Sequence, residues 1–201
     1  PLTFVIPTRK RHRELSACLR SIAEQIAEQD QDVRIVVLFN HSDVDTVRAI
    51  ERCRDRWPFV SSVGLDGEPD YAEKFRHMFR AAPDSEWVWT FGDDDLLQPN
   101  ALKFMLDRLG KTDKDLSFIH VAEDNRSTGS GNTYTGTMLE LCCQFGWVEF
   151  TGFISGNITR TPLFLKCAES PNWKLYARSA YVQSCVLLEV LRDEKSQFID
   201  L

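Results

Sequence analysis

The first half of the chain alternates between two hydrophobic patterns. Short continuous apolar runs, rich in β-branched and aromatic residues, are typical of buried strands. Longer segments, in which apolar residues recur every three or four positions, are typical of helices with one buried face. The predicted strands are Thr3–Pro7, Val33–Phe39, Val60–Leu65 and Glu86–Phe91, and the predicted helices between them are Arg11–Gln29, Asp43–Arg56 and Tyr71–Ala81.

This order predicts parallel strands that are connected by right-handed helical crossovers. Because continuous apolar strands need cover on both faces, the predicted fold class is α/β, a mostly parallel central sheet with flanking helices. Ligands of such folds bind at the carboxyl ends of the strands. Polar residues follow three of the strands, at Thr8–Arg9, Asn40–Ser42 and Asp93–Asp95. We therefore expect these residues to meet at one edge of the sheet and to form a site.

The second half of the chain has a less regular pattern. It predicts helices at Pro99–Leu109, Thr137–Phe145, Pro162–Ala168 and Ala177–Leu191, and strands at Leu116–Val121 and Phe150–Thr159, the last of them interrupted by two glycines. The polar segment Glu123–Thr135 is rich in Gly, Ser and Thr, so we expect a loop or hairpin near the site. Two roles are open for Arg160, a contact to a phosphate or a structural role at the surface.

Length, composition and charge restrict the class of protein. The 201 residues, 43% of them apolar, suit a single domain over residues 1–201. The net charge of −6 argues against a nucleic-acid partner, because no basic stripe is present to neutralise a phosphate backbone. A basic cluster from Arg9 to Arg13 suits a solvated helix start, an anionic ligand or a membrane surface.

The cysteines and the chain ends bear on location. The six cysteines include no Cys-x-x-Cys pair, which predicts reduced, mostly buried thiols and a cytoplasmic protein. No apolar run approaches the ~18 residues of a membrane span, and we expect no signal peptide. The chain begins at Pro1 without a Met and stops at Leu201 without an obvious terminus, so an excised domain, truncated at its C-terminus, is one interpretation.

Asp93, Asp94 and Asp95 form the most distinctive polar group of the chain. Adjacent carboxylates repel one another, and a divalent cation among them relieves the repulsion; Mg²⁺ and Mn²⁺ prefer such oxygen ligands. A cation with few protein ligands keeps open positions, which suit the phosphates of a nucleotide. The alternative is a solvated acidic turn, but the position of the triplet after the fourth predicted strand favours a metal and diphosphate site.

Several segments together carry a family resemblance over about residues 1–165. They are Phe4–Arg11, Val36–Asp45, Tyr71–Phe75, Trp87–Leu102 and Ile154–Arg160. In this order they resemble the opening strand, second strand, approach to the DxD motif, the motif itself and the acceptor-side strand of glycosyltransferase family 2. The resemblance implies a GT-A fold and an enzyme that moves a sugar from a nucleotide-sugar donor to an acceptor hydroxyl.

The resemblance also implies roles for individual residues. The donor half would be residues 1–97 and the acceptor half residues 98–201. Asp93 and Asp95 would hold Mn²⁺ or Mg²⁺. Asn40 stands where the family often has Asp near the base, which leaves the choice of base open. The residues expected to bind the nucleotide-sugar are Pro7, Thr8, Arg9, Asn40, Lys74, Asp93 and Asp94.

Inverting transfer, which the family leads us to expect, needs a general base for the acceptor hydroxyl. Residues 170–184, where many members carry an acidic residue, contain no carboxylate. Glu149 is therefore the candidate base, with Glu169 as the nearest alternative. The resemblance further implies a role in polysaccharide or surface-glycan biosynthesis, with a glycan or lipid-linked acceptor. Peripheral association with the inner face of the membrane is compatible with it.

Two other classes remain open. One is a sugar nucleotidyltransferase, which shares an α/β sheet and metal-binding carboxylates. Such an enzyme usually needs a glycine-rich basic phosphate loop early in the chain, and residues 7–13 contain no glycine. The other is a non-catalytic nucleotide-binding GT-A-like domain of a larger protein, which the absence of a clear base favours.

Overall fold

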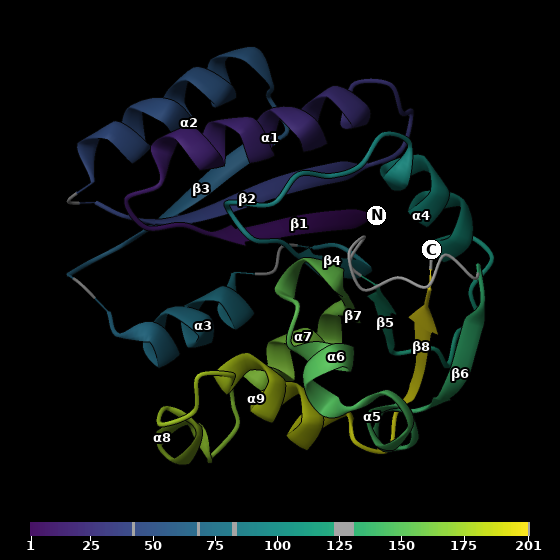
Figure 1. Ribbon diagram of the computed structural model, residues 1–201. Coiled ribbons are helices and arrows are strands. Elements are labelled where there is room, and N and C mark those ends of the chain that lie inside the picture. The colour runs from purple at the N-terminus through teal and green to yellow at the C-terminus, as the bar shows by residue number, and fades with distance from the viewer. Residues whose placement is uncertain (42, 68, 82–83, 123–130, 201) are drawn as a thin grey trace.

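A single mixed sheet organises the protein. The computed structural model describes residues 1–41, 43–67, 69–81, 84–122 and 131–200. Within these residues the sheet has eight strands in the order β3-β2-β1-β4-β7-β5-β8-β6 (Figure 1). The strands are β1 (Leu2–Pro7), β2 (Val33–Asn40), β3 (Val60–Leu65), β4 (Trp87–Thr90), β5 (Phe118–Val121), β6 (Thr133–Thr137), β7 (Asn157–Arg160) and β8 (Lys195–Ile199).

The strand directions confirm the mostly parallel sheet. β1 pairs in parallel with β2 and β4, and β2 pairs in parallel with β3. β7 runs antiparallel to both of its neighbours, β4 and β5, so that β5 points the same way as β4. β8 is parallel to β5, and β6 is antiparallel to β8. We call the edge at which β1, β2, β4 and β5 end the carboxyl edge; the antiparallel strand β7 begins there.

Helices cover both faces of the sheet and give a three-layer α/β fold (Figure 1). One layer contains α1 (His12–Ile26), α2 (Val44–Arg56) and α4 (Ala101–Leu109). The other contains α3 (Tyr71–Arg80), α5 (Met138–Phe145), α6 (Trp147–Thr151), α7 (Thr161–Cys167), α8 (Trp173–Tyr176) and α9 (Val182–Leu191). The predicted fold class is therefore confirmed.

The first strand shows why the apolar runs are continuous. Leu2, Phe4 and Ile6 belong to the hydrophobic cluster beneath α1, α2 and α4, whereas Val5 belongs to the cluster on the opposite face. Successive side chains of a strand point to opposite faces, so a strand covered on both sides is apolar at every position. The continuous apolar pattern thus follows from the central place of β1 in the sheet.

The segment Phe150–Thr159 is not the single strand that its pattern predicts. Phe150 lies in α6, a short 3-10 turn covers Ile154–Gly156, and β7 begins only at Asn157. Gly156 lies so close to β5 that a Cβ atom there would be 2.5 Å from the carbonyl oxygen of Val121. The glycine therefore marks a close approach of two backbones, not a break within one strand.

The hydrophobic pattern does not predict two of the strands near the C-terminus, β6 and β8. The pattern assigns no strand to β8, and it includes the start of β6 in the polar segment Glu123–Thr135, of which residues 123–130 lie outside the described part. β8 lies between β5 and β6, and β6 pairs with it in an antiparallel ladder. Strand formation here depends on long-range pairing more than on local propensity. The helix predicted over Ala177–Leu191 begins at Val182 and follows the short helix α8.

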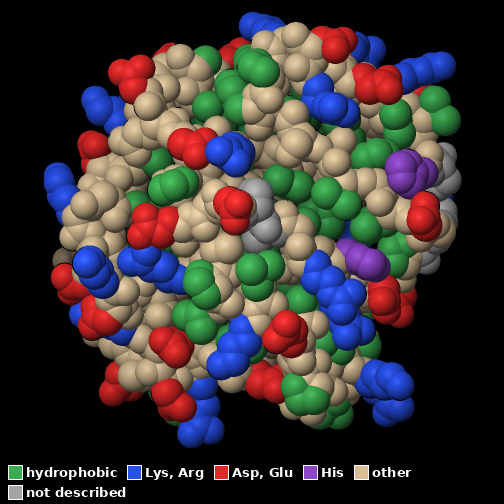
Figure 2. Space-filling model, turned by 180° about the vertical axis from the view of Figure 1, so that it is seen from behind, with side chains coloured by type: hydrophobic (Ala, Val, Ile, Leu, Met, Phe, Trp, Pro, Cys, Tyr) green, Lys and Arg blue, Asp and Glu red, His purple; other side chains and the backbone are tan. Residues whose placement is uncertain are grey.

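The surface mixes charges of both signs. On the face shown in Figure 2, Lys and Arg side chains are interspersed with Asp and Glu, and hydrophobic side chains lie in small groups. None of the helices in the described residues combines the length and the apolar character needed to cross a membrane. All six cysteines are free thiols, and Cys18, Cys53, Cys142 and Cys167 are buried.

Arg160 lies at the edge of the sheet opposite the Asp triplet. Because β7 is antiparallel to β4, Arg160 at its end pairs with Trp87, the first residue of β4. The guanidinium carbon lies 4.1 Å from the Trp87 ring centroid, and Nε donates to the carbonyl oxygen of Leu116 at 3.0 Å. An ion pair with Glu86 completes the contacts. These contacts assign a structural role to Arg160.

Replacing Arg160 should therefore destabilise the fold. Arg160→Ala removes the cation–π contact and leaves the carbonyl of Leu116 without this donor, so we expect the free energy of unfolding to fall by about 1–3 kcal/mol. Urea denaturation measures the change. Arg192→Ala is the matched control, because Arg192 is 65% exposed and pairs only with its neighbour Asp193. The structural role is refuted if both variants lose the same stability.

Candidate functional site

Polar side chains from β1, β4 and α3 meet at the carboxyl edge, as the sequence predicts. The hydroxyl of Thr8 donates to Oδ2 of Asp93 at 2.7 Å, and both residues are buried. Lys74, on the first turn of α3, sends its Nζ to the carbonyl oxygen of Thr8 at 2.5 Å. Segments that are far apart in the chain thus converge on one point. The ends of β1 and β4 thus form one polar cluster with Lys74. Of the third predicted strand end, Asn40 contacts Gly67, and Ser42 lies outside the described residues.

The loop between β1 and α1 is held in an unusual conformation. Lys10 has a φ of 56°, in the left-handed region that residues other than glycine rarely adopt. Its N–H donates to Oδ2 of Asp43 at 2.7 Å, and the same carboxylate caps α2 by accepting from the N–H of Thr46. Burial opposes ionisation of Asp43, but the bonds from Thr46 and Lys10 outweigh it and lower the pKa. Asp43 therefore fixes the basic loop that faces the triplet.

Arg11 neutralises two of the three carboxylates. Its Nη1 contacts Oδ1 of Asp93 at 3.2 Å and Oδ2 of Asp94 at 2.5 Å. Asp93 is buried, whereas Arg11 and Asp94 are half exposed. An exposed ion pair is typically worth only about 0–1 kcal/mol, so this pairing orients the carboxylates more than it stabilises the fold. The sequence marked Arg11 only as part of a basic cluster, not as a partner of the triplet.

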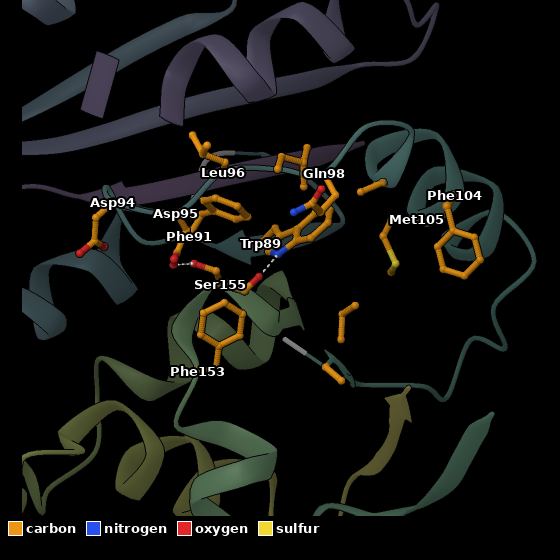
Figure 3. Close-up of a pocket in the computed structure, with 14 residues that line it drawn as sticks. Trp89, Phe91, Asp94, Asp95, Leu96, Gln98, Phe104, Met105, Phe153 and Ser155 are labelled. Carbon is orange, nitrogen blue, oxygen red and sulfur yellow. Dashed lines mark hydrogen bonds between the residues drawn. The ribbon is translucent and has the colours of Figure 1, made fainter. Parts of the chain in front are cut away.

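Asp95 has a different environment, which Ser155 provides. The hydroxyl of Ser155 donates to Oδ2 of Asp95 at 2.5 Å and accepts from the N–H of Gly92 at 2.7 Å. The carbonyl oxygen of Ser155 accepts from Nε1 of Trp89 at 2.7 Å (Figure 3). Since β7 is antiparallel, Ser155 precedes that strand at the same edge where β4 ends. Sequence reasoning placed this serine in the acceptor-side segment but gave it no role.

Gly92 leaves the space that this arrangement needs. A Cβ atom at Gly92 would lie 2.6 Å from Oδ2 of Asp95 and 3.3 Å from the hydroxyl of Ser155. The Sγ of Cys18, on α1, lies 3.4 Å from the Gly92 carbonyl oxygen. Gly92 is therefore enclosed by α1 on one side and the Asp95–Ser155 pair on the other, and no larger residue fits without moving them.

The carboxylate of Asp95 lacks a compensating positive charge. Burial raises its pKa, the hydrogen bond from Ser155 lowers it, and the charges of Asp94 and Asp93 raise it again; the net pKa lies above the ordinary value. Within the described residues Asp95 forms no ion pair, whereas Asp93 and Asp94 share Arg11. A cation at Asp95 would therefore remove an electrostatic cost.

Lys74 is a half-buried cation beside the same cluster. Burial lowers its pKa to about 8, although Asp93 acts in the opposite direction. Such a lysine is mostly charged at pH 7 and loses its charge above pH 8, and an anionic ligand would favour the charged form. The position supports the predicted contact of Lys74 with an anion.

Asn40 presents an unsatisfied acceptor at the end of β2. Its Nδ2 donates to the carbonyl oxygen of Gly67 at 3.1 Å, which sets the orientation of the amide. Its Oδ1 is buried and has no hydrogen-bond partner in the described part of the chain. A buried polar atom without a partner costs free energy, so it points to a ligand that donates an N–H or O–H group.

The donor set at the triplet suits a hard divalent cation in chemical terms. Carboxylate oxygens are the ligands that Mg²⁺ and Mn²⁺ prefer, and Asp95 has no cation of the protein beside it. Among the described residues, no group of three or more His, Cys, Asp or Glu side chains is arranged to hold a metal ion. A cation here would therefore need ligands from a bound molecule in addition to one or two carboxylates.

A pocket of about 560 Å³ lies beside the end of β4, between α4 and β5 (Figure 3). We call it the apolar pocket. It is lined by Trp89, Phe91, Asp94, Asp95, Leu96, Leu97, Gln98, Ala101, Phe104, Met105, Val121, Ala122, Phe153 and Ser155. Its volume lies within the range of about 300–1,000 Å³ that is typical of small-molecule sites. The triplet thus separates a basic region at Thr8, Arg11 and Lys74 from a largely hydrophobic one.

The remaining predicted site residues lie as follows. Pro7 ends β1, and Arg9 is exposed in the loop after it. Glu149 lies in α6 with an exposed side chain and is not among the residues that line the apolar pocket. The role of Glu149 as a base stays a prediction.

The comparisons with known proteins now identify the family. The model of the family described as glycosyl transferase family 2 matches residues 3–180. The chain belongs to glycosyltransferase family 2. No curated protein matches this family 2 chain by sequence. The prediction of a glycosyltransferase, which began with the strand ends and the triplet, is confirmed at the level of the family.

Solved structures share the fold. S. aureus TarS 1–349 in complex with UDP has a TM-score of 0.71 and 16% identity, over 99% of this chain and 57% of that chain. The mannosyltransferase PcManGT from Pyrobaculum calidifontis, in complex with GDP-Man and Mn²⁺, has a TM-score of 0.65 and 14% identity, over 97% and 53%. These likenesses confirm the GT-A fold. This family 2 chain spans little more than half of either crystallised chain and 35% of a longer TarS chain.

The fold also occurs in a protein of another activity. 4-diphosphocytidyl-2C-methyl-D-erythritol synthase from Anaerococcus prevotii has a TM-score of 0.56 and 14% identity, over 98% of this chain and 87% of that chain. At such identity the likeness concerns the fold alone. It therefore does not decide between a glycosyltransferase and a nucleotidyltransferase, whereas the family match does.

The uncompensated charge of Asp95 predicts a gain in stability when it is removed. The folded-state pKa of Asp95 lies above the unfolded value, so ionisation at neutral pH costs stability. Asp95→Asn should raise the free energy of unfolding at pH 7 in EDTA. The gain should shrink as the pH falls through the raised folded-state pKa and vanish below the unfolded-state pKa of about 3.9, where the carboxyl is neutral in both states. Denaturant unfolding between pH 3 and 8 measures it.

The control for this experiment is Asp107→Asn, which removes an exposed carboxylate of α4. That variant should follow the wild-type pH dependence. If Asp95→Asn is destabilising at pH 7, the carboxylate is compensated and the electrostatic account of the site is wrong.

Proposed function

We propose that this domain is a metal-dependent glycosyltransferase that moves a sugar from a nucleotide-sugar donor to an acceptor hydroxyl. The observation that carries the proposal is the division of charge at the carboxyl edge. Asp95 lacks a counter-charge, whereas Arg11 and Lys74 lie beside Asp93. A nucleoside diphosphate with a divalent cation matches both features, because the cation meets Asp95 and the phosphates meet the basic side chains.

The donor would lie across the ends of β1, β2 and β4. Pro7, Thr8 and Arg9 border this region, and Asn40 offers its buried Oδ1 to an N–H of the base or a hydroxyl of the ribose. Lys74 is the half-buried cation that would meet the diphosphate. TarS and PcManGT, which share the fold, have been crystallised with UDP and with GDP-Man, and this supports a nucleotide-sugar as the donor.

A bound cation would neutralise the charge that develops on the diphosphate as it leaves. Asp95 and Asp93 would hold it, and the presence of Mn²⁺ in the PcManGT structure supports a divalent ion. In the reaction the bond between the anomeric carbon and the diphosphate oxygen breaks, and its electrons leave with the diphosphate. A new bond joins the anomeric carbon to the acceptor oxygen, whose proton passes to a general base.

Inversion and a place in polysaccharide or surface-glycan assembly belong to the same proposal. Both rest on the family, and Glu149 remains the sequence-based candidate for the base. The two alternatives differ in what they need. A nucleotidyltransferase would release pyrophosphate, and a non-catalytic domain would bind a nucleotide without turnover. The nature of the products therefore separates the three.

The direct test is nucleotide binding and donor turnover with Asp95 changed. Titration with UDP, GDP, CDP and dTDP, with and without Mn²⁺, should show one or two that bind more tightly with the metal. Asp95→Ala should abolish the metal effect and lower turnover of the matching nucleotide-sugar about a hundredfold or more. Asp107→Ala is the control. Full activity of Asp95→Ala would exclude the metal role. Release of pyrophosphate from a nucleoside triphosphate and a sugar 1-phosphate would favour the nucleotidyltransferase.

The lowered pKa of Lys74 predicts a pH dependence of nucleotide binding. Above pH 8 the free protein loses the charge of Lys74, so the Kd for the nucleoside diphosphate should rise by up to about tenfold per pH unit. Lys74→Arg keeps its charge at this pH and should flatten the profile between pH 7 and 9. Calorimetry in Mg²⁺ measures both, with Lys103→Arg as a control on the surface of α4. A profile unchanged by Lys74→Arg would exclude this contact.

A further inference from the structure

The apolar pocket and the basic region lie on opposite sides of β4. Thr8 follows β1, which is one neighbour of β4, whereas Ser155 and Val121 belong to the segments of β7 and β5 on the other side. The pocket is bounded above by the chain that follows the triplet and by α4 (Figure 3). Asp95 is shared, since it lines the pocket and lies next to Asp93. A ligand in the pocket would therefore reach the same carboxylate as a ligand in the basic region.

Most of the side chains that line the pocket are apolar. Trp89, Phe91 and Met105 are buried side chains of the wall, and Leu96 and Phe104 at the rim are 59% and 42% exposed. The indole N–H of Trp89 already donates to the carbonyl oxygen of Ser155. A bare sugar ring would find few hydrogen-bond partners there, because the polar lining is confined to Asp94, Asp95, Gln98 and Ser155. Burying polar hydroxyl groups without partners is unfavourable.

We propose that the apolar pocket binds the hydrocarbon part of the acceptor, so that the acceptor is a glycoside or alcohol carrying an aliphatic chain. The inference rests on the proposed function, which places the anionic donor in the basic region and leaves the pocket for the acceptor. The aliphatic chain of the acceptor fills the space between α4 and β5. The reacting hydroxyl lies at the polar end, beside Asp95 and Ser155. The bound aliphatic chain also buries part of the exposed side chains of Leu96 and Phe104 at the rim.

The test uses methyl, butyl, hexyl and octyl β-D-glucopyranoside, each below its critical micelle concentration. Burial of one methylene is worth roughly a fourfold change in affinity. The Kd should therefore fall steadily from butyl to octyl in the wild-type protein, and the methyl glycoside should bind weakest. Calorimetry or tryptophan fluorescence provides the Kd. A Kd that does not depend on chain length would overturn the proposal.

Matched variants place the binding in the pocket. Leu96→Gln and Phe104→Gln change exposed rim residues, so the fold should be kept, and each should weaken octyl glycoside binding about tenfold and flatten the dependence on chain length. Leu175→Gln is the control, because Leu175 is 68% exposed on α8 and does not line the pocket. Equal weakening by all three variants, or none in the rim variants, would refute binding in the pocket.

A nucleotide titration separates this proposal from the proposed function. UDP and GDP with Mn²⁺ should bind the rim variants as they bind the wild type, because Leu96 and Phe104 lie outside the basic region. If the wild type binds nucleotides but its Kd for the alkyl glycosides does not depend on chain length, the acceptor proposal alone is removed. Failure of every nucleotide to bind the wild type would instead remove the proposed function, whatever the alkyl glycosides do.

Discussion

Repulsion among three adjacent carboxylates is the constraint around which the site is built. Asp93 and Asp94 are relieved by Arg11, and the buried Asp93 also accepts from Thr8. Among the described residues, the side chain of Asp95 accepts a hydrogen bond from the neutral hydroxyl of Ser155 and forms no ion pair, so its charge is oriented without being compensated. This is the kind of local cost that proteins carry at functional sites and offset elsewhere in the fold. The proposed cation would supply that compensation.

The antiparallel strand β7 determines which groups meet the triplet. If β7 were parallel to β4, Ser155, which precedes β7, would lie at the edge where the strands begin, away from the triplet. Because β7 runs the opposite way, Ser155, which precedes it, reaches the carboxyl edge, and Arg160 at its end lies at the far edge. The same reversal brings Ser155 to the wall of the apolar pocket. The direction of this one strand thus places Ser155 beside the triplet and Arg160 at the opposite edge of the sheet, within the same short segment.

The charged and hydrophobic halves of the site suit the two kinds of substrate in the proposed reaction. A nucleoside diphosphate needs positive charge and hydrogen-bond groups, which Arg11, Lys74 and Asn40 provide at the ends of β1 and β2. An aliphatic acceptor needs neither, and the walls around Trp89 and Met105 offer apolar surface. Both substrates must reach one reacting centre, and Asp95 is the residue at which the two regions adjoin.

The sequence by itself determined the α/β class, the order of the first four strands along the chain and the meeting of Thr8 with the triplet. These follow from hydrophobic period and from the rule that parallel strands end at one edge. Only the tertiary structure decided the direction of β7, the pairing of β8, and the partners of Arg11 and Ser155. Such features depend on contacts between residues that are far apart in the sequence. The bond from Ser155 to Asp95 joins residues 60 positions apart, and a local hydrophobic pattern cannot predict it.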